Sequence, residues 1–185
     1  NNPVYATSLG DRRFDDKLGD ISLAQRDKET DQARAFSNRL AAIPDGELSP
    51  AERTNKGVLQ RLLNEQVEEN SFGQRMMLFS TYDGWHQSFA GMADSLPFYK
   101  AADYESYLKR LKAYAKYNQQ AIAISREALK KGYVQPCEAL GGFEKTIMGA
   151  VEGDPDKTRF FAPFTRARPA DLTEPQWVAM QAEAA

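Results

Sequence analysis

The sequence contains a single cysteine, a single histidine and no long apolar run, and each shortage excludes a class of protein. With Cys137 alone, neither an internal disulfide nor a multi-cysteine zinc site is possible. No apolar run approaches the roughly 18 residues that cross a bilayer, so we expect no transmembrane segment. A zinc hydrolase usually needs two histidines and a carboxylate, and His86 stands alone. We therefore expect no catalytic residue and no metal ligand in this chain.

The charge balance also argues against a nucleic-acid partner. Lysine and arginine number 24 against 26 aspartates and glutamates, which gives a net charge of −2. No basic stripe follows any predicted helix, so the electrostatic signature of nucleic-acid binding is missing. At 185 residues, of which 42% are hydrophobic, the chain is long enough for one domain with its own core. We predict a single helical domain over residues 1–185.

Hydrophobic periodicity predicts an all-α fold, an irregular bundle of about five helices. The clearest start signal is Ser49 with Pro50 and Glu52, which together form a capping box with proline at the first helical position. Strand-like alternation of convincing length is lacking. The predicted helices cover residues 23–43, 50–72, 103–131, 136–151 and 174–185.

Between the second and third predicted helices, residues 73–102 lose the helical period. This stretch mixes glycine and proline with six aromatic residues, so we predict a long ordered loop. A segment so rich in aromatic side chains is unlike disordered sequence. This loop, residues 73–102, is the first candidate for a binding surface.

Three consecutive residues of this loop, Trp85, His86 and Gln87, are candidate substrate-binding residues. In a functional interpretation they line a peptide-binding cleft, where the imidazole donates a hydrogen bond to substrate. In the alternative, His86 ties the loop to its own backbone and Trp85 is a buried anchor. The residues themselves leave both interpretations open.

A second candidate pair is Arg12 and Arg13, which lie among nearby acidic residues. They can form bidentate salt bridges that pin the N-terminal segment to the bundle, or they can clamp a substrate carboxylate. The neighbouring acids that would serve the first role are Asp11, Asp15 and Asp16. Cys137 lacks any nucleophile signature shared with His86, and we expect it to be a small buried side chain.

Several segments resemble one bacterial family in their order and spacing. The two most informative are PVYATSLGDRRFDD at residues 3–16 and YDGWHQSF at residues 82–89. Shorter matches are LSP at 48–50, DYESYLKRL at 103–111, KGYVQP at 131–136 and FAPF at 161–164. Together they resemble domain-of-unknown-function family 885.

The resemblance implies a metallopeptidase, because such family members look like zinc enzymes with an HExxH helix far downstream. By this likeness the chain is the N-terminal portion of a larger protein, walls a substrate cleft and lacks the catalytic motif. Zinc is then expected in the full-length parent, whose C-terminal catalytic part is the partner of this chain, and a peptide is the implied substrate. Such proteins are often exported, many as lipoproteins, so an extracytoplasmic location is implied.

One alternative from a different class of function remains. The chain can act by itself as a non-catalytic helical binding or scaffold module, with the aromatic loop at residues 76–98 as its interaction face. The sequence does not decide between the two.

Overall fold

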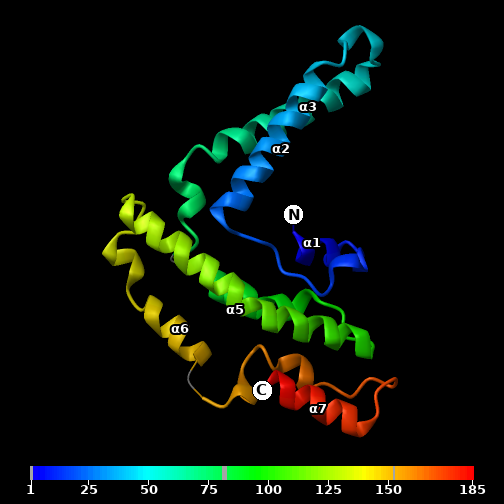
Figure 1. Cartoon of the computed structure of the whole chain (residues 1–185), viewed down its shortest axis with the longest axis vertical. Coiled ribbons are helices and arrows are strands. Elements are labelled where there is room, and N and C mark those ends of the chain that lie inside the picture. Colours follow the sequence, from blue (N-terminus) through cyan, green and yellow to red (C-terminus); the bar gives the residue numbers. More distant parts are fainter. Residues whose placement is uncertain (1, 81–82, 152) are drawn as a thin grey trace. The chain divides into compact units, whose positions relative to one another are not determined.

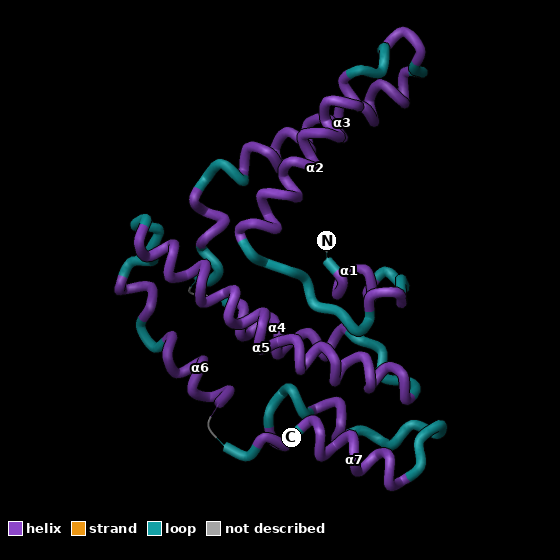
Figure 2. Tube along the Cα trace, viewed as in Figure 1, coloured by secondary structure: helices purple, strands orange, loops and turns teal. Residues whose placement is uncertain are grey.

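The computed structural model describes residues 2–80, 83–151 and 153–185, and it confirms the all-α prediction (Figure 1). These residues form α-helices connected by loops and short 3-10 helices, and no strand is drawn among them (Figure 2). The α-helices are α1 (Pro3–Ser8), α2 (Leu23–Ala41), α3 (Pro50–Glu69), α4 (Trp85–Gly91), α5 (Ala101–Lys130), α6 (Phe143–Val151) and α7 (Glu174–Ala184).

Helices α2 and α3 begin at the positions predicted from the sequence, and each has the expected N-terminal cap. The Ser22 hydroxyl accepts a hydrogen bond from the Gln25 amide at the start of α2. Ser49 and Glu52 form a complete capping box at the start of α3. Each cap satisfies amide groups that the first helical turn leaves without partners.

Two predicted elements differ from the observed ones. Residues 73–102 are not a loop throughout, because they contain α4 and two 3-10 turns, Gly73–Met76 and Met92–Ser95. The fourth predicted helix is interrupted: a 3-10 turn, Cys137–Leu140, precedes α6. The physical cause of the break is Gly142, whose φ of +82° lies in the left-handed region that an α-helix cannot continue through.

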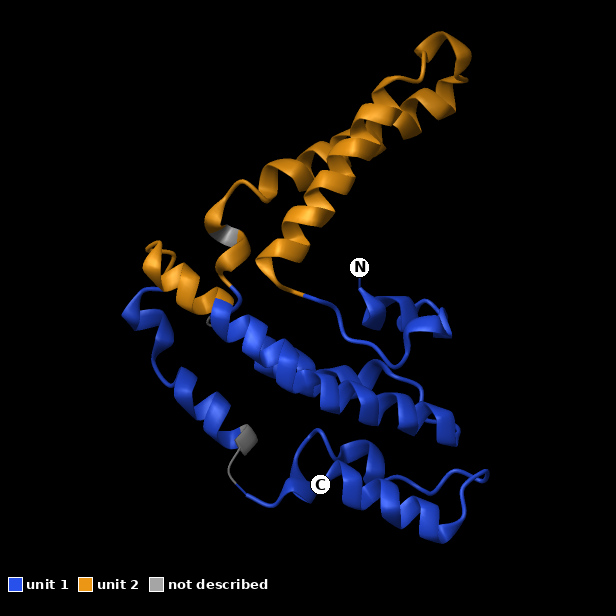
Figure 3. Cartoon of the chain, in the orientation of Figure 1, with its two compact units in different colours: residues 1–20, 78–123, 135–185 blue, residues 21–77, 124–134 orange. Residues whose placement is uncertain are grey.

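The chain divides into two compact units (Figure 3). Unit 1 comprises residues 1–20, 78–123 and 135–185, and unit 2 comprises residues 21–77 and 124–134. Helix α5 contributes its first 23 residues to unit 1, since it begins at residue 101 and unit 1 includes it up to residue 123. The single domain predicted over residues 1–185 stays a prediction.

Unit 2 is built on a helical hairpin in which α2 and α3 lie side by side (Figure 1). A polar contact joins the two helices, because the Ser37 hydroxyl donates to Asn64 Oδ1 at 2.7 Å. Helix α3 has no fully buried residue, and its apolar side chains Val58, Leu59 and Leu62 are exposed. The hairpin therefore presents an apolar face to solvent.

Unit 1 contains an aromatic core centred on α5. Tyr104 and Tyr107 of this helix are buried against Phe164 and Trp177, with Phe89 of α4 in the same cluster. The Tyr107 hydroxyl donates to the Phe160 carbonyl at 3.0 Å, and burial raises the pKa of Tyr107. Tyr107 thus packs as a core residue whose hydroxyl is satisfied, and Tyr104 is buried beside it.

A buried cation joins the N-terminal segment to α5 within unit 1. Arg110 is only 1% exposed, and its Nε donates to the Lys17 carbonyl at 3.0 Å. Its Nη2 donates to Thr7 Oγ1 at 2.8 Å and to the Phe14 carbonyl at 3.1 Å. Burial lowers the pKa of Arg110, although a guanidinium stays protonated in proteins. The N-terminal segment thus supplies the oxygen atoms that replace water around this charge.

Within the described ranges, no helix is long and apolar enough to cross a membrane.

Replacing Arg110 by methionine tests the buried cation. The variant Arg110→Met keeps an apolar stem but removes the guanidinium that donates to Thr7 Oγ1 and to the Lys17 and Phe14 carbonyls, so we expect the free energy of unfolding to fall by about 3 kcal/mol. Chemical denaturation gives this value. The matched control is Arg13→Met, whose parent side chain is 79% exposed and which should change stability by less than about 0.5 kcal/mol. Equal effects of the two substitutions would contradict the assignment.

Candidate functional site

The candidate site begins at a tight turn in unit 1 that leads into α4. Phe79 and Gly84 form an isolated antiparallel bridge, and the Ser80 amide donates to the Asp83 carbonyl at 2.7 Å. Asp83 Oδ1 accepts from the Gly84 amide and from the Ser88 hydroxyl, both at 2.8 Å. The turn therefore places residues 85–87 in the first turn of α4. Tyr82 of the same motif lies outside the described residues.

Trp85 is anchored to α5. Its indole Nε1 donates to Asn118 Oδ1 at 2.8 Å, and its ring meets the Phe79 and His86 rings edge-on at centroid distances of 5.9 and 5.8 Å. The side chain is only partly exposed. The geometry thus fixes Trp85 by a polar contact at one end and by ring packing along its length.

His86 connects α4 to α6 through Thr146. The Thr146 hydroxyl donates its only proton to the Phe143 carbonyl at 2.7 Å, and its oxygen lies 2.9 Å from His86 Nε2. With that proton directed at Phe143, the hydroxyl oxygen is free to accept from Nε2, an arrangement that favours the tautomer with its proton on Nε2. The ring also packs edge-on against Phe143 at 5.2 Å.

The other imidazole nitrogen, Nδ1, is buried and has no hydrogen-bond partner within the described part of the chain. It lies against the backbone of Gly84, where an added Cβ would approach His86 Nδ1 to 2.9 Å. A glycine at this position therefore permits the close approach of the ring. Desolvation lowers the pKa of His86, opposed by the negative charge of Asp83, so the neutral imidazole is favoured.

Gln87 is the residue of the three that faces open space. It is exposed and borders a cavity of about 110 Å³, together with Ser80, Ala139, Gly141, Gly142, Phe143 and Thr146. Within the described residues its side-chain amide has no hydrogen-bond partner. An amide that offers both donor and acceptor groups is suited to contact a peptide backbone.

The arginine pair lies elsewhere in unit 1, at the N-terminal segment. Arg12 donates to Asp15 and to Asp103, whose carboxylate is almost fully buried at the start of α5. Arg13 forms an ion pair with Asp11, with Nη2 to Oδ2 at 2.6 Å, and it holds the pKa of that carboxyl at about 2. Both guanidinium groups are therefore occupied by carboxylates of the chain itself. Among the described residues, the hydrogen bonds of Arg12 and Arg13 go to Asp11, Asp15 and Asp103, and none of them reaches Trp85, His86 or Gln87.

The partners that fix the site were missed by the sequence analysis. Asn118 and Thr146 lie 33 and 60 residues away from Trp85 and His86 along the chain. No local pattern signals such contacts, because an isolated asparagine or threonine on a helix is common. Only covariation or a structure could reveal them.

The described residues do not fit a zinc ion. No group of three or more histidine, cysteine, aspartate or glutamate side chains in residues 2–80, 83–151 and 153–185 could hold a metal. The expectation of a buried Cys137 is wrong, since this thiol is exposed on a single 3-10 turn that lies outside the core.

Comparison with known proteins gives one family. The family model described as "Bacterial protein of unknown function (DUF885)" matches residues 3–185 of the chain. No curated protein matches the sequence.

The neutral imidazole can be checked by NMR, because His86 is the only histidine. We expect its titration midpoint below the ordinary value of about 6.5, with ¹⁵N shifts that report a proton on Nε2. The pKa of His86 is lower in the folded state than in the unfolded state. Below a pH of about 6.5 the unfolded state therefore binds more protons than the folded state. Stability linked to His86 is therefore present above that pH and is lost as the pH falls toward the folded pKa. The same titration in urea is the control, and a folded midpoint at or above the urea value would refute the assignment.

Proposed function

The chain belongs to the bacterial family DUF885, and from this membership we propose that it forms the non-catalytic, substrate-contacting part of a zinc-dependent metallopeptidase. The peptidase class is taken from the resemblance of its motifs to such enzymes. In this proposal the chain is the N-terminal helical portion of the parent protein. The zinc and the catalytic residues belong to the remainder of that parent, which is the partner of this chain.

The observation that carries the proposal is the position of Gln87. Its amide borders the cavity beside α6 and has no partner within the residues described, so it is available to a peptide group. Trp85 and His86 support it from the same helical turn, because Asn118 and Thr146 hold their rings in place. These two contacts fix the backbone position in α4 from which the Gln87 side chain projects.

In this proposal the described side chains neither bind zinc nor take part in the hydrolytic reaction. The single histidine uses Nε2 to bind Thr146, and its Nδ1 is covered by Gly84. What this chain supplies is therefore binding and orientation of substrate. An extracytoplasmic location, periplasmic or lipid-anchored, is part of the same proposal and rests on the resemblance alone.

A second candidate function is a helical binding or scaffold module. It is favoured by the apolar face of the α2–α3 hairpin, where a groove of about 550 Å³ is lined by Phe36, Arg39, Leu40, Ile43, Leu59 and Leu63. Exposed apolar grooves of this kind commonly contact other proteins. Metal content and hydrolysis distinguish the two candidates.

The test compares this 185-residue chain with the full-length product of the same gene. We expect about one zinc per molecule and peptide hydrolysis only in the full-length protein, measured by metal analysis and by cleavage of a peptide library. In that protein, Gln87→Ala should raise KM by about 3- to 10-fold at nearly constant kcat, because it removes one neutral hydrogen bond that substrate and transition state share.

The control variant is Gln119→Ala, at an exposed position of α5, which should leave KM unchanged. A full-length protein that holds no zinc and cleaves no peptide would overturn the peptidase proposal and favour the scaffold module. A Gln87→Ala variant with unchanged KM would remove Gln87 from the substrate contacts.

A further inference from the structure

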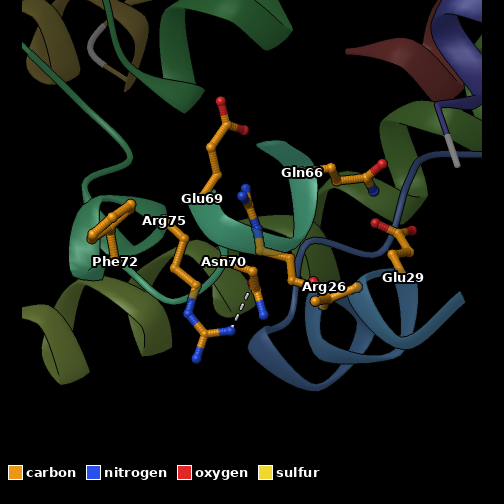
Figure 4. Close-up of a pocket in the computed structure, with 8 residues that line it drawn as sticks. Arg26, Glu29, Gln66, Glu69, Asn70, Phe72 and Arg75 are labelled. Carbon is orange, nitrogen blue, oxygen red and sulfur yellow. Dashed lines mark hydrogen bonds between the residues drawn. The ribbon is translucent and has the colours of Figure 1, made fainter. Parts of the chain in front are cut away.

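Unit 2 contains a polar pocket of about 360 Å³ to which neither the predicted site nor the proposed function assigns a role (Figure 4). It lies where the first turns of α2 meet the last turn of α3 and the residues that follow. Thr30 is its buried member, and Gln66, Glu69 and Phe72 are exposed around it. The complete lining is Arg26, Glu29, Thr30, Gln66, Glu69, Asn70, Phe72 and Arg75.

Arg26 is a cation without a counterion. Among the residues that the structure describes, its side chain has no ion pair or hydrogen bond, and its Nε is buried without a partner. Figure 4 shows the side chain extending into the midst of the labelled residues. Its guanidinium therefore remains available to pair with an incoming carboxylate.

The second arginine of the pocket is already occupied. Arg75 forms an ion pair with Asp27, and its Nη1 also donates to Asn70 Oδ1 at 2.9 Å (Figure 4). Asn70 in turn donates from Nδ2 to Asp27 at 3.0 Å, which closes a three-residue network. Arg26 is therefore the cation of this pocket that remains available.

A carboxylate of the pocket is likewise available. The Glu29 carboxylate accepts from the Gln25 side-chain amide at 2.9 Å, whereas the Glu69 carboxylate has no hydrogen-bond or ion-pair partner within the described chain. Glu69 is the last residue of α3, where the partial negative charge of a helix C-terminus adds to its own. This combination attracts an ammonium group.

Arg26 and Glu69 thus offer opposite charges to the same pocket without an ion pair between them. A single small molecule that carries both a carboxylate and an ammonium group would satisfy both. The volume is at the lower end of the range for ligand sites, which suits a molecule of amino-acid size. Phe72, 55% exposed beside these groups, supplies an apolar surface for the ligand's side chain.

We propose that this pocket binds a free α-amino acid with an apolar side chain, its carboxylate on Arg26 and its ammonium on Glu69. The proposal does not rest on the peptidase function. Binding to the pocket can be measured on this chain without zinc or hydrolysis, so the two proposals fail separately.

Isothermal titration calorimetry with L-leucine tests it directly. We expect saturable binding in the range of about 0.1 to 1 mM, as befits a small ligand held by two charged contacts. N-acetyl-L-leucine lacks the ammonium charge and L-leucinamide lacks the carboxylate, and each should bind at least about tenfold more weakly. No saturable L-leucine binding would overturn the proposal, and so would equal binding of either blocked compound.

Two substitutions locate the binding. Arg26→Gln and Glu69→Gln should each weaken L-leucine binding by about tenfold or more. Arg34→Gln, at an exposed position of α2, is the matched control and should bind like the parent chain. Glu69 is exposed and unpaired, so its substitution keeps the test valid even where Arg26→Gln lowers stability. Unchanged binding in Glu69→Gln, or an equal loss in Arg34→Gln, would place the ligand elsewhere and refute the proposal.

Discussion

The structure of unit 1 depends on the burial of one positive charge. Arg110 carries its guanidinium into the interior without a direct carboxylate partner, so neutral oxygens must take the place of water around it. Those oxygens come from the N-terminal segment, which wraps across α5. A second link runs from Arg12 to the buried Asp103 at the start of the same helix. The hydrogen bonds to the Arg110 guanidinium thus order the N-terminal segment, which buries little apolar surface of its own.

The candidate site depends on the same helix. Asn118, the partner of the Trp85 indole, follows Arg110 by eight positions, and both are part of α5. The N-terminal segment and the first turn of α4 therefore share one support, and the aromatic core around Tyr104 and Tyr107 holds that support rigid. His86 then connects α4 to α6, and Gln87 faces the cavity between them. Long-range contacts, rather than local sequence, define this arrangement.

Much of the fold could be predicted from the sequence because its helices carry local signals. Ser22, Ser49 and Thr173 mark helix starts by their own chemistry, and the tyrosine spacing of α5 identifies its buried side. Helix α4 was missed because it spans only seven residues and shows no repeat of its apolar period. The site was harder still. Trp85, His86 and Gln87 stand out in the sequence, but whether each contacts substrate or its own chain depends on Asn118, Thr146 and Gly84, which only the tertiary structure brings together.

Amide hydrogen exchange of the unmodified chain tests most directly whether the buried charge orders the N-terminal segment. The account predicts that the hydrogen-bonded amides of Ala6, Asp11 and Lys17 exchange only when α5 opens, with protection like that of residues 104–121. Fast, unprotected exchange at these amides beside a protected α5 would contradict it. The segment would then be attached only loosely, and Arg110 would not be the interaction on which unit 1 depends.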